Sequence, residues 1–439
     1  MSIITLSLLL VGILFFLLII GLPLAWSLGG TAMVVCLVAF DGNIGIITMQ
    51  VSRIFDMAQS YSLMAVPLFV MMASLLQRSG VAEQLFRAAY VWAGGLRGGL
   101  ALGTMFANLI MATMVGVVGA EIVTLGMIAL PEMLKNKYDD RLALGTLAAG
   151  GGLATLIPPS VVFIVYGMTA SCSVSDLFIA GIMPGILLFF LFTGYVIYHC
   201  WRHPESAPLP PDEMRNMTIK QKFAEMKGLV VPLIITFGVL GSIYAGVATP
   251  TEAAGVGVLL VLVASILNGS FNRKMWWESC VETLKVSCML TWLFFGAQTI
   301  IGAYTLAGGT AFVNEFMNNL GLGRWGTIIL INLIWIFLGT FLDWIGVLFL
   351  TVPIFLPVIL GLGFDPVWFG VLYCMNMHIS YLSPPFAPSS FYIKSIAPPE
   401  ISMTRIYVAT MPFLALTVIA QIIVTFWIDL SLWLPNMMR

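Results

Sequence analysis

The chain has 439 residues, of which 60% are apolar and only 9% are charged. Soluble domains carry roughly 25% charged residues, so the composition excludes a soluble protein and predicts an integral protein of the lipid bilayer. The net charge of −1 provides no basic surface and argues against a nucleic-acid partner. The six cysteines are scattered, mostly inside apolar segments, without metal-type or redox-type spacing, so we expect them to be small core residues.

The first apolar segment runs from Ile3 to Ile20, and the first basic residue of the chain is Arg53. A secretory signal would have a positively charged start and a shorter apolar stretch, so we expect a retained membrane span. Because no basic residue precedes this span, the N-terminus is expected on the periplasmic side of a bacterial inner membrane. Further apolar runs follow along the chain: Met64 to Leu76, Phe178 to Tyr198, Leu229 to Leu240, Val256 to Leu267, Ile328 to Leu338 and Tyr407 to Trp427.

The longest polar stretch, residues 201–228, lies near the middle of the chain and holds five of the 19 Lys and Arg residues. The positive-inside bias places such a loop in the cytoplasm. A polar linker at the centre of a membrane protein also suggests that the two halves are repeats.

The two halves share a proline pattern. In each half a single proline precedes a double proline by 27 residues, and an aromatic-Asp pair lies at the same offset between them: Pro131, Tyr138-Asp139 and Pro158-Pro159, then Pro357, Phe364-Asp365 and Pro384-Pro385. An outward N-terminus and an inward central loop require an odd number of crossings in the first half. The second half must then be inserted upside down, which is the inverted-repeat plan of secondary transporters.

The repeat predicts an all-α polytopic membrane protein built from two inverted halves. We expect the first repeat over residues 1–200, with a helical hairpin over 101–134 and a broken helix over 141–171. The second is expected over 229–439, with a hairpin over 325–360 and a broken helix over 366–396. An amphipathic surface helix is predicted before each hairpin, over Val81 to Gly94 and Trp276 to Ser287. The hairpin arms are too short to cross with a polar tip, so we expect both hairpins to be re-entrant.

The two double prolines predict breaks that carry function. A double proline removes two backbone donors and frees carbonyl oxygens one turn earlier. Such oxygens are hard ligands suited to Na⁺, and the half-helix that begins after the break points its positive end at an anion. The alternative is that each double proline only kinks its helix, and two breaks at matched positions favour the functional interpretation.

The segment Gly150-Gly-Gly-Leu-Ala-Thr-Leu-Ile-Pro-Pro-Ser160, followed by Gly181-Ile-Met-Pro184-Gly185, resembles the large (M) subunit of TRAP transporters, the tripartite ATP-independent periplasmic family. Ala248-Thr-Pro-Thr-Glu-Ala253 and Gly363-Phe-Asp-Pro366 also resemble that family, so the likeness covers almost the whole chain. It implies an elevator-type ion-transporter fold. It also implies two partners, a small four-helix membrane subunit (Q) and a soluble periplasmic substrate-binding protein (P).

In the family, Na⁺ is held by the hairpin tips together with the broken helices. Carried over to this chain, the resemblance implies the sodium ligands Thr113, Gly116, Thr155, Pro158, Ser160, Gly339, Thr340, Asp343, Ser383 and Pro384. The candidate substrate-binding residues are Pro159, Pro385, Glu121, Ser389 and Lys394. The chain departs from the family where Val115-Gly116-Val117 replaces Ser-Gly-Ser, where Ser383 replaces Thr and where Ala387 replaces Gly.

Several buried charges have two interpretations each. Glu121 and Asp343 lie within the hairpins, where an acid is by default a functional candidate, although each could instead cap a helix. For Glu252 a structural cap is favoured. Lys394 could face a substrate carboxylate or extend to the membrane surface. His378 is expected to be a buried structural histidine rather than a proton carrier.

We therefore predict the translocating subunit of a Na⁺-coupled, binding-protein-dependent importer of organic acids. The chain has no Gly-Lys-Ser/Thr phosphate loop, so it must draw on an ion gradient rather than on ATP. A stand-alone Na⁺- or H⁺-coupled organic anion symporter is the alternative transporter. A membrane-embedded enzyme would need clustered His, Asp or Cys, which the three histidines of this sequence do not supply.

Overall fold

The computed structural model describes residues 2–209 and 217–438, and within them every regular element is a helix. Residues 210–216 of the predicted linker lie outside the described residues. Seven of the described helices are long and apolar enough to cross a membrane: Tyr61–Arg78, Val174–Arg202, Lys227–Tyr244, Pro250–Leu267, Arg273–Leu306, Trp344–Gly361 and Met403–Phe426. The chain is thus an all-helical, multi-span membrane protein.

The first half consists of three opening helices and a longer series that ends at the linker. In order they are α1 (Ile3–Ile19), α2 (Leu24–Ala39), α3 (Ile44–Ala58), η1 (Tyr61–Met64), α4 (Ala65–Arg78), α5 (Val81–Ala93), α6 (Gly99–Val115), α7 (Val118–Lys135), α8 (Asp140–Gly152), η2 (Leu153–Thr155), α9 (Val161–Ala170) and α10 (Val174–Arg202).

After the turn η3 (Pro204–Ser206), the second half follows. Its helices are α12 (Ile219–Glu225), α13 (Lys227–Tyr244), α14 (Pro250–Leu267), α15 (Arg273–Leu306), α16 (Gly309–Asn319), α17 (Gly323–Gly339), α18 (Trp344–Gly361), α19 (Pro366–Leu382), α20 (Pro388–Ile396), α21 (Met403–Phe426) and α22 (Asp429–Met438).

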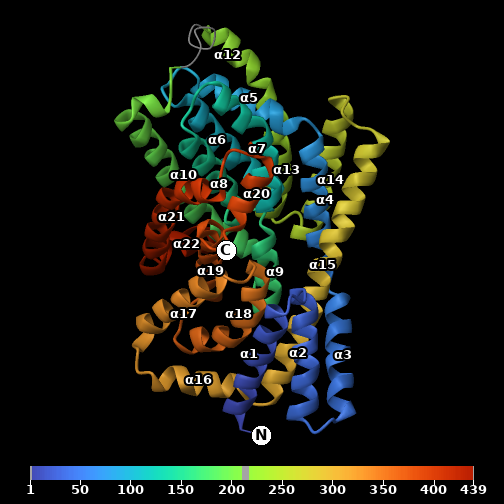
Figure 1. The fold of residues 1–439 in the computed structure, drawn as a ribbon. Coiled ribbons are helices and arrows are strands. Elements are labelled where there is room, and N and C mark those ends of the chain that lie inside the picture. The colour runs from blue at the N-terminus through green and yellow to red at the C-terminus, as the bar shows by residue number, and fades with distance from the viewer. Residues whose placement is uncertain (1, 210–216, 439) are drawn as a thin grey trace.

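The helix order of the first half recurs in the second. The helix pair α6–α7 corresponds in order to α17–α18, and the interrupted helix α8–α9 corresponds to α19–α20. Figure 1 shows α5, α6 and α7 at one end of the molecule and α16, α17 and α18 at the other. The repeated aromatic-Asp pair has a local cause in both halves. Asp139 caps α8 by accepting a hydrogen bond from the Arg141 N–H at 2.7 Å, and Asp365 caps α19 through the Val367 N–H at 2.7 Å.

The amphipathic helix predicted over Trp276 to Ser287 is wrong. Those residues belong to α15, a continuous helix of 34 residues, and the short amphipathic helix in this half is α16. In the order of helices, α15 lies where the first half has α3, η1 and α4. Of its polar residues, Glu278, Glu282 and Thr283 contact α4.

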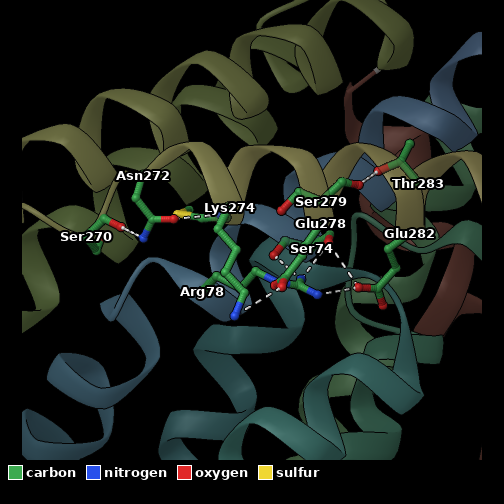
Figure 2. Close-up of polar contacts among 10 residues, drawn as sticks. Ser74, Arg78, Ser270, Asn272, Lys274, Glu278, Ser279, Glu282 and Thr283 are labelled. Carbon is green, nitrogen blue, oxygen red and sulfur yellow. Dashed lines mark hydrogen bonds and ion pairs between the residues drawn. The ribbon is translucent and has the colours of Figure 1, made fainter.

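This contact between α4 and α15 is a cluster of ion pairs (Figure 2). The Arg78 Nη2 atom lies 2.7 Å from the Glu282 Oε2 atom, and its Nε atom lies 3.5 Å from the Glu278 Oε2 atom. The Ser74 hydroxyl also donates to the Glu282 carboxylate, at 3.3 Å. A helix of the first half is thereby joined to one of the second.

Candidate functional site

Both double prolines interrupt a helix. Between α8 and α9 the chain passes through the turn η2 and residues 156–160, and between α19 and α20 it passes through residues 383–387. The Pro158-Pro159 and Pro384-Pro385 peptide bonds are both cis. The first break is fully enclosed, whereas Pro385 and Phe386 of the second are exposed. Each break leaves backbone oxygens that no helix uses.

The turn between α6 and α7 packs directly on the first break. Gly116 has a left-handed backbone with φ of +65°, and its carbonyl accepts a hydrogen bond from the Val161 N–H at 3.3 Å. A Cβ atom at this position would lie 2.3 Å from the Pro159 carbonyl oxygen. Only glycine allows this backbone and this approach together.

The turn between α17 and α18 packs beside the second break. A Cβ atom on Gly339 would lie 2.0 Å from the Ser380 hydroxyl of α19. The Tyr373 hydroxyl of α19 donates to the Trp344 carbonyl at the start of α18. Asp343 immediately precedes α18. The two halves therefore use the same arrangement, a short interhelical turn held against a helix that a double proline interrupts.

The two halves also meet each other at matched positions. Gly152 and His378 each lie six residues before the first proline of their break, and a Cβ atom on Gly152 would lie 2.6 Å from the His378 ring. The His378 Nδ1 atom is 3.4 Å from the Thr155 hydroxyl of the first break. His378 is fully buried and stacks at a tilt on Phe192. It fills the space that glycine leaves, which agrees with the structural interpretation.

One cavity brings the two turns and the two interrupted helices together. Its volume is ≈ 190 Å³, and its walls include the turn after α6, the starts of α7, α9 and α18, and residues of α19 and α20. The remaining wall comes from α4 and α15. The lining residues are Val70, Gly116, Val117, Val118, Gly119, Val161, Val162, Val286, Met289, Leu290, Asp343, Trp344, Ile345, Tyr381 and Tyr392.

The hydroxyls predicted as sodium ligands at the breaks all donate their protons to the backbone. Thr155 donates to the Gly152 carbonyl at 2.9 Å, Ser160 to the Thr155 carbonyl at 2.7 Å, and Ser383 to the Ile379 carbonyl at 2.8 Å. A hydroxyl that has donated its proton keeps two acceptor lone pairs. Together with the carbonyls freed by Pro158 and Pro384, these oxygens form the kind of donor set that a hard cation prefers.

Thr113 contacts another helix, whereas Thr340 donates to the backbone as the hydroxyls at the breaks do. The Thr113 hydroxyl contacts the Thr236 hydroxyl of α13 at 2.7 Å and donates to the Ile110 carbonyl at 2.6 Å. The Thr340 hydroxyl donates to the Phe337 carbonyl of its own helix at 2.7 Å. Gly116, Gly339 and Asp343 remain at the tips of the two turns.

The predicted substrate residues separate into two groups. Glu121 and Ser389 are fully buried, and neither the Glu121 carboxylate nor the Ser389 hydroxyl has a hydrogen-bond partner among the described residues. Lys394 instead donates to the Ile401 carbonyl at 2.7 Å and to the Pro399 carbonyl at 3.3 Å. The Pro385 carbonyl accepts from the Tyr407 hydroxyl at 2.9 Å. Pro159 faces Gly116, as described above.

Glu252 lies outside this site. It forms a capping box with Thr249 at the start of α14, where its carboxylate accepts from the Thr249 N–H at 2.8 Å. The structural interpretation of this acid is confirmed.

Sequence reasoning missed the aromatic residues of the cavity. Tyr392 lies eight residues after the first proline of the second break, and Tyr166 lies eight residues after that of the first. The matched positions of Tyr166 and Tyr392 were the sequence signal that could have identified Tyr392 as a site residue. Tyr392 lines the cavity, and its ring lies 2.6 Å from the position of a Cβ atom on Gly119. Tyr381 and Trp344 had no comparable repeat signal.

The comparisons with known proteins settle the family. The model of the tripartite ATP-independent periplasmic transporter, DctM component, matches residues 11–430. The chain belongs to the DctM family. The C4-dicarboxylate TRAP transporter large permease protein DctM of Vibrio cholerae serotype O1 is 30% identical over 443 residues, covering 96% of this chain and 95% of that protein.

Two further comparisons extend this result. The isethionate TRAP transporter permease protein DctMQ of Oleidesulfovibrio alaskensis is 28% identical over 93% of this DctM-family chain and 63% of its own length. The structure of the Alcanivorax borkumensis YdaH transporter matches with a TM-score of 0.59 at 14% identity, over 90% of each chain. That likeness concerns the fold. This DctM-family chain is accordingly a multi-pass transport component of a bacterial TRAP system, and not an enzyme.

Proposed function

We propose that this chain is the translocating subunit of a Na⁺-coupled importer of organic acids that works by an elevator movement. The observation that carries the proposal is the shared cavity, because both interhelical turns and both interrupted helices contribute to its wall. An ion that orders the turns would thereby complete the substrate pocket. The α6–α9 and α17–α20 helices would move together, while α4 and α15 would belong to the stationary frame.

Sodium is the coupling ion that the oxygen ligands favour. Hydroxyl and carbonyl oxygens at the two breaks suit a hard monovalent cation. Each net positive charge that enters the cell with the substrate gains roughly 2.3 kcal/mol per 100 mV of membrane potential. A few such charges supply enough free energy to concentrate a dilute solute.

The two halves are proposed to be inverted repeats with re-entrant α6–α7 and α17–α18 hairpins. The recurring helix order and the opposite ends that these pairs occupy in Figure 1 support this arrangement. We place the N-terminus in the periplasm and residues 201–228 in the cytoplasm of the inner membrane. On that basis a polar cavity of ≈ 580 Å³, which Arg53 and Asp56 line together with the end of α9, faces the periplasm.

A small membrane subunit and a soluble periplasmic binding protein are the proposed partners. Family membership supports both, and the relative from Oleidesulfovibrio alaskensis carries M and Q in one printed name. The alternative, a stand-alone symporter, needs neither partner.

Reconstitution tests the proposal and its rival. Proteoliposomes that contain this chain with its small subunit should take up substrate only when the binding protein and an inward Na⁺ gradient are both present. Replacing Na⁺ by K⁺ while a proton gradient is kept should abolish uptake. Uptake by this chain alone with Na⁺ would support the stand-alone symporter, and uptake driven by protons would contradict sodium coupling.

A further inference from the structure

The cavity that the two turns and the two breaks share has apolar and aromatic walls. Valines of four helices and of the turn before α7 contribute to it, among them Val118, Val161 and Val162. Trp344, Tyr381 and Tyr392 provide aromatic surface. Such walls stabilise a ligand mainly through its apolar surface.

Three helices begin at this cavity. The first residues of α7, α9 and α18, which are Val118, Val161 and Trp344, all line it. Neither α7 nor α9 has a side chain that caps its first turn. The Val161 N–H of α9 donates to the Gly116 carbonyl, and the N–H groups that follow in the first turn keep their donor capacity. Each helix start carries roughly half a positive charge, so the three together supply about +1.5.

The charged side chains at the cavity leave room for one negative charge on the substrate. Asp343 is the only charged residue among the described residues that line it. Lys394, the nearest basic residue along the second break, donates to the carbonyls of Pro399 and Ile401. The hydroxyls proposed as sodium ligands at the breaks, Thr155, Ser160 and Ser383, do not line the cavity, whereas Asp343 does. Among the groups that line it, one Na⁺ beside Asp343 would offset its carboxylate and leave the three helix starts to balance the ligand.

This balance discriminates against two classes of solute. A second carboxylate would be desolvated without a cationic side chain among the described lining residues. A sugar acid or polyol would leave most of its hydroxyls unpaired, because only Asp343 and the three aromatic side chains of these residues bring polar groups to the wall. An aromatic or branched hydrocarbon body meets neither penalty.

We infer that this permease carries a monoanionic organic acid with an aromatic or branched apolar body, rather than a dicarboxylate or a sugar acid. The inference rests on the proposed function and narrows its substrate class. The inferred substrate class differs from that of the Vibrio cholerae relative, whose printed name gives C4-dicarboxylate as the substrate.

Binding to the purified chain in lipid nanodiscs tests the inference. The probes are phenylacetate, succinate and D-gluconate, each in NaCl and in KCl. Thermal unfolding and the tryptophan fluorescence that Trp344 contributes to are the readouts. With Na⁺ present, phenylacetate should bind at least tenfold more tightly than succinate or gluconate, because it alone matches both the charge and the walls.

A pair of variants tests whether the cavity is responsible. Val162→Thr keeps the shape of the side chain but adds a hydroxyl to the wall, and it should weaken phenylacetate binding several-fold. Val230→Thr, an exposed position on α13 that is not part of the cavity, is the matched control and should leave binding unchanged. Comparable melting temperatures show that both variants are folded.

The outcomes separate this inference from the proposed function. Sodium alone should raise the melting temperature if the proposed ion sites exist, whatever the substrate. If Na⁺ stabilises the chain and succinate or gluconate binds as tightly as phenylacetate, the substrate class is wrong. The same holds if no probe binds, or if Val162→Thr and Val230→Thr behave alike. If Na⁺ has no effect while phenylacetate binds in KCl, the sodium coupling is wrong and the substrate class stands.

Discussion

Single glycines determine how closely the interhelical turns approach the breaks. Gly116 needs both a left-handed backbone and the space that a Cβ atom would occupy against Pro159. Gly152 leaves room for the His378 ring in a similar way. At these positions the absence of a side chain creates the contact.

Replacing Gly116 by Ala should disrupt the first break. The left-handed backbone alone costs about 1–2 kcal/mol for an L-residue, and the new methyl group would overlap the Pro159 carbonyl. We expect uptake to fall at least tenfold and the melting temperature to drop. Gly12→Ala on α1, where a Cβ atom meets nothing within 4 Å, should change neither. Uptake within twofold of the wild type would contradict a tight turn-to-break contact.

Thr155→Val tests the sodium ligands of the first break. Loss of the hydroxyl should raise the Na⁺ concentration for half-maximal uptake about tenfold, which corresponds to roughly 1.4 kcal/mol. Thr155→Ser should restore the affinity. The control is Thr113→Val, because the Thr113 hydroxyl contacts Thr236 on α13 instead of the break. Equal shifts for Thr155→Val and Thr113→Val would count against a sodium site at Thr155.

At the scale of elements, the long helix α15 of the second half is joined by ion pairs to α4 of the first half. Its 34 residues run without interruption, and its acidic residues pair with Arg78 at the end of α4 (Figure 2). This arrangement suits a stationary frame, since it joins helices from both halves with contacts that need not change during transport.

Arg78→Gln should therefore affect stability more than transport. Arg78 and its partners Glu278 and Glu282 are all partly exposed, so the ion pairs contribute about 1 kcal/mol. We expect a slightly lower melting temperature and uptake close to that of the wild type. Lys274→Gln, which removes an 85% exposed partner of Glu278, should change neither quantity. Loss of uptake in a folded Arg78→Gln protein would show that this cluster takes part in the movement.

At the scale of the whole molecule, the cavity lies between the helices proposed to move and those proposed to stay. Val118 and Val162 belong to the first group, and Val70, Val286 and Leu290 belong to the second. An elevator requires these two groups to slide past each other in every cycle.

Chemical tethering across the cavity should stop transport. The background protein carries Cys280→Ala and Cys288→Ala, because these cysteines lie near the tethered position on α15. A reducible bifunctional thiol reagent that joins Val118→Cys to Val286→Cys should lower uptake at least tenfold, and a reductant should restore it.

The matched control joins Val70→Cys to Leu290→Cys, which both lie in the proposed frame. This tether brings the same reagent to the same cavity without linking the two groups of helices, so a smaller effect is expected. Equal inhibition by both tethers would indicate obstruction of the cavity and contradict the elevator movement.

Local chemistry along the chain accounts for much of this architecture. Two double prolines must interrupt their helices because they lack backbone donors, and each aromatic-Asp pair lies where an aspartate caps the next helix. The apolar runs and the low charge require a bilayer. The family resemblance led us to expect Gly116, Gly339 and Asp343 at the tips of the two turns.

Only the tertiary structure decided which side chains face the cavity. Thr113 has a hydroxyl that could bind Na⁺, and Lys394 has an ammonium group that could bind a carboxylate. The Thr113 hydroxyl instead contacts Thr236, and the Lys394 ammonium group donates to the Ile401 carbonyl. The cavity walls come from seven helices, so Tyr381 and Trp344 join it through packing that no local pattern encodes. Likewise, the acids of α15 pair with Arg78, about 200 residues earlier in the chain, which no local pattern indicates. A sequence pattern reports the constraints on neighbouring residues, whereas contacts between distant segments depend on how the helices pack.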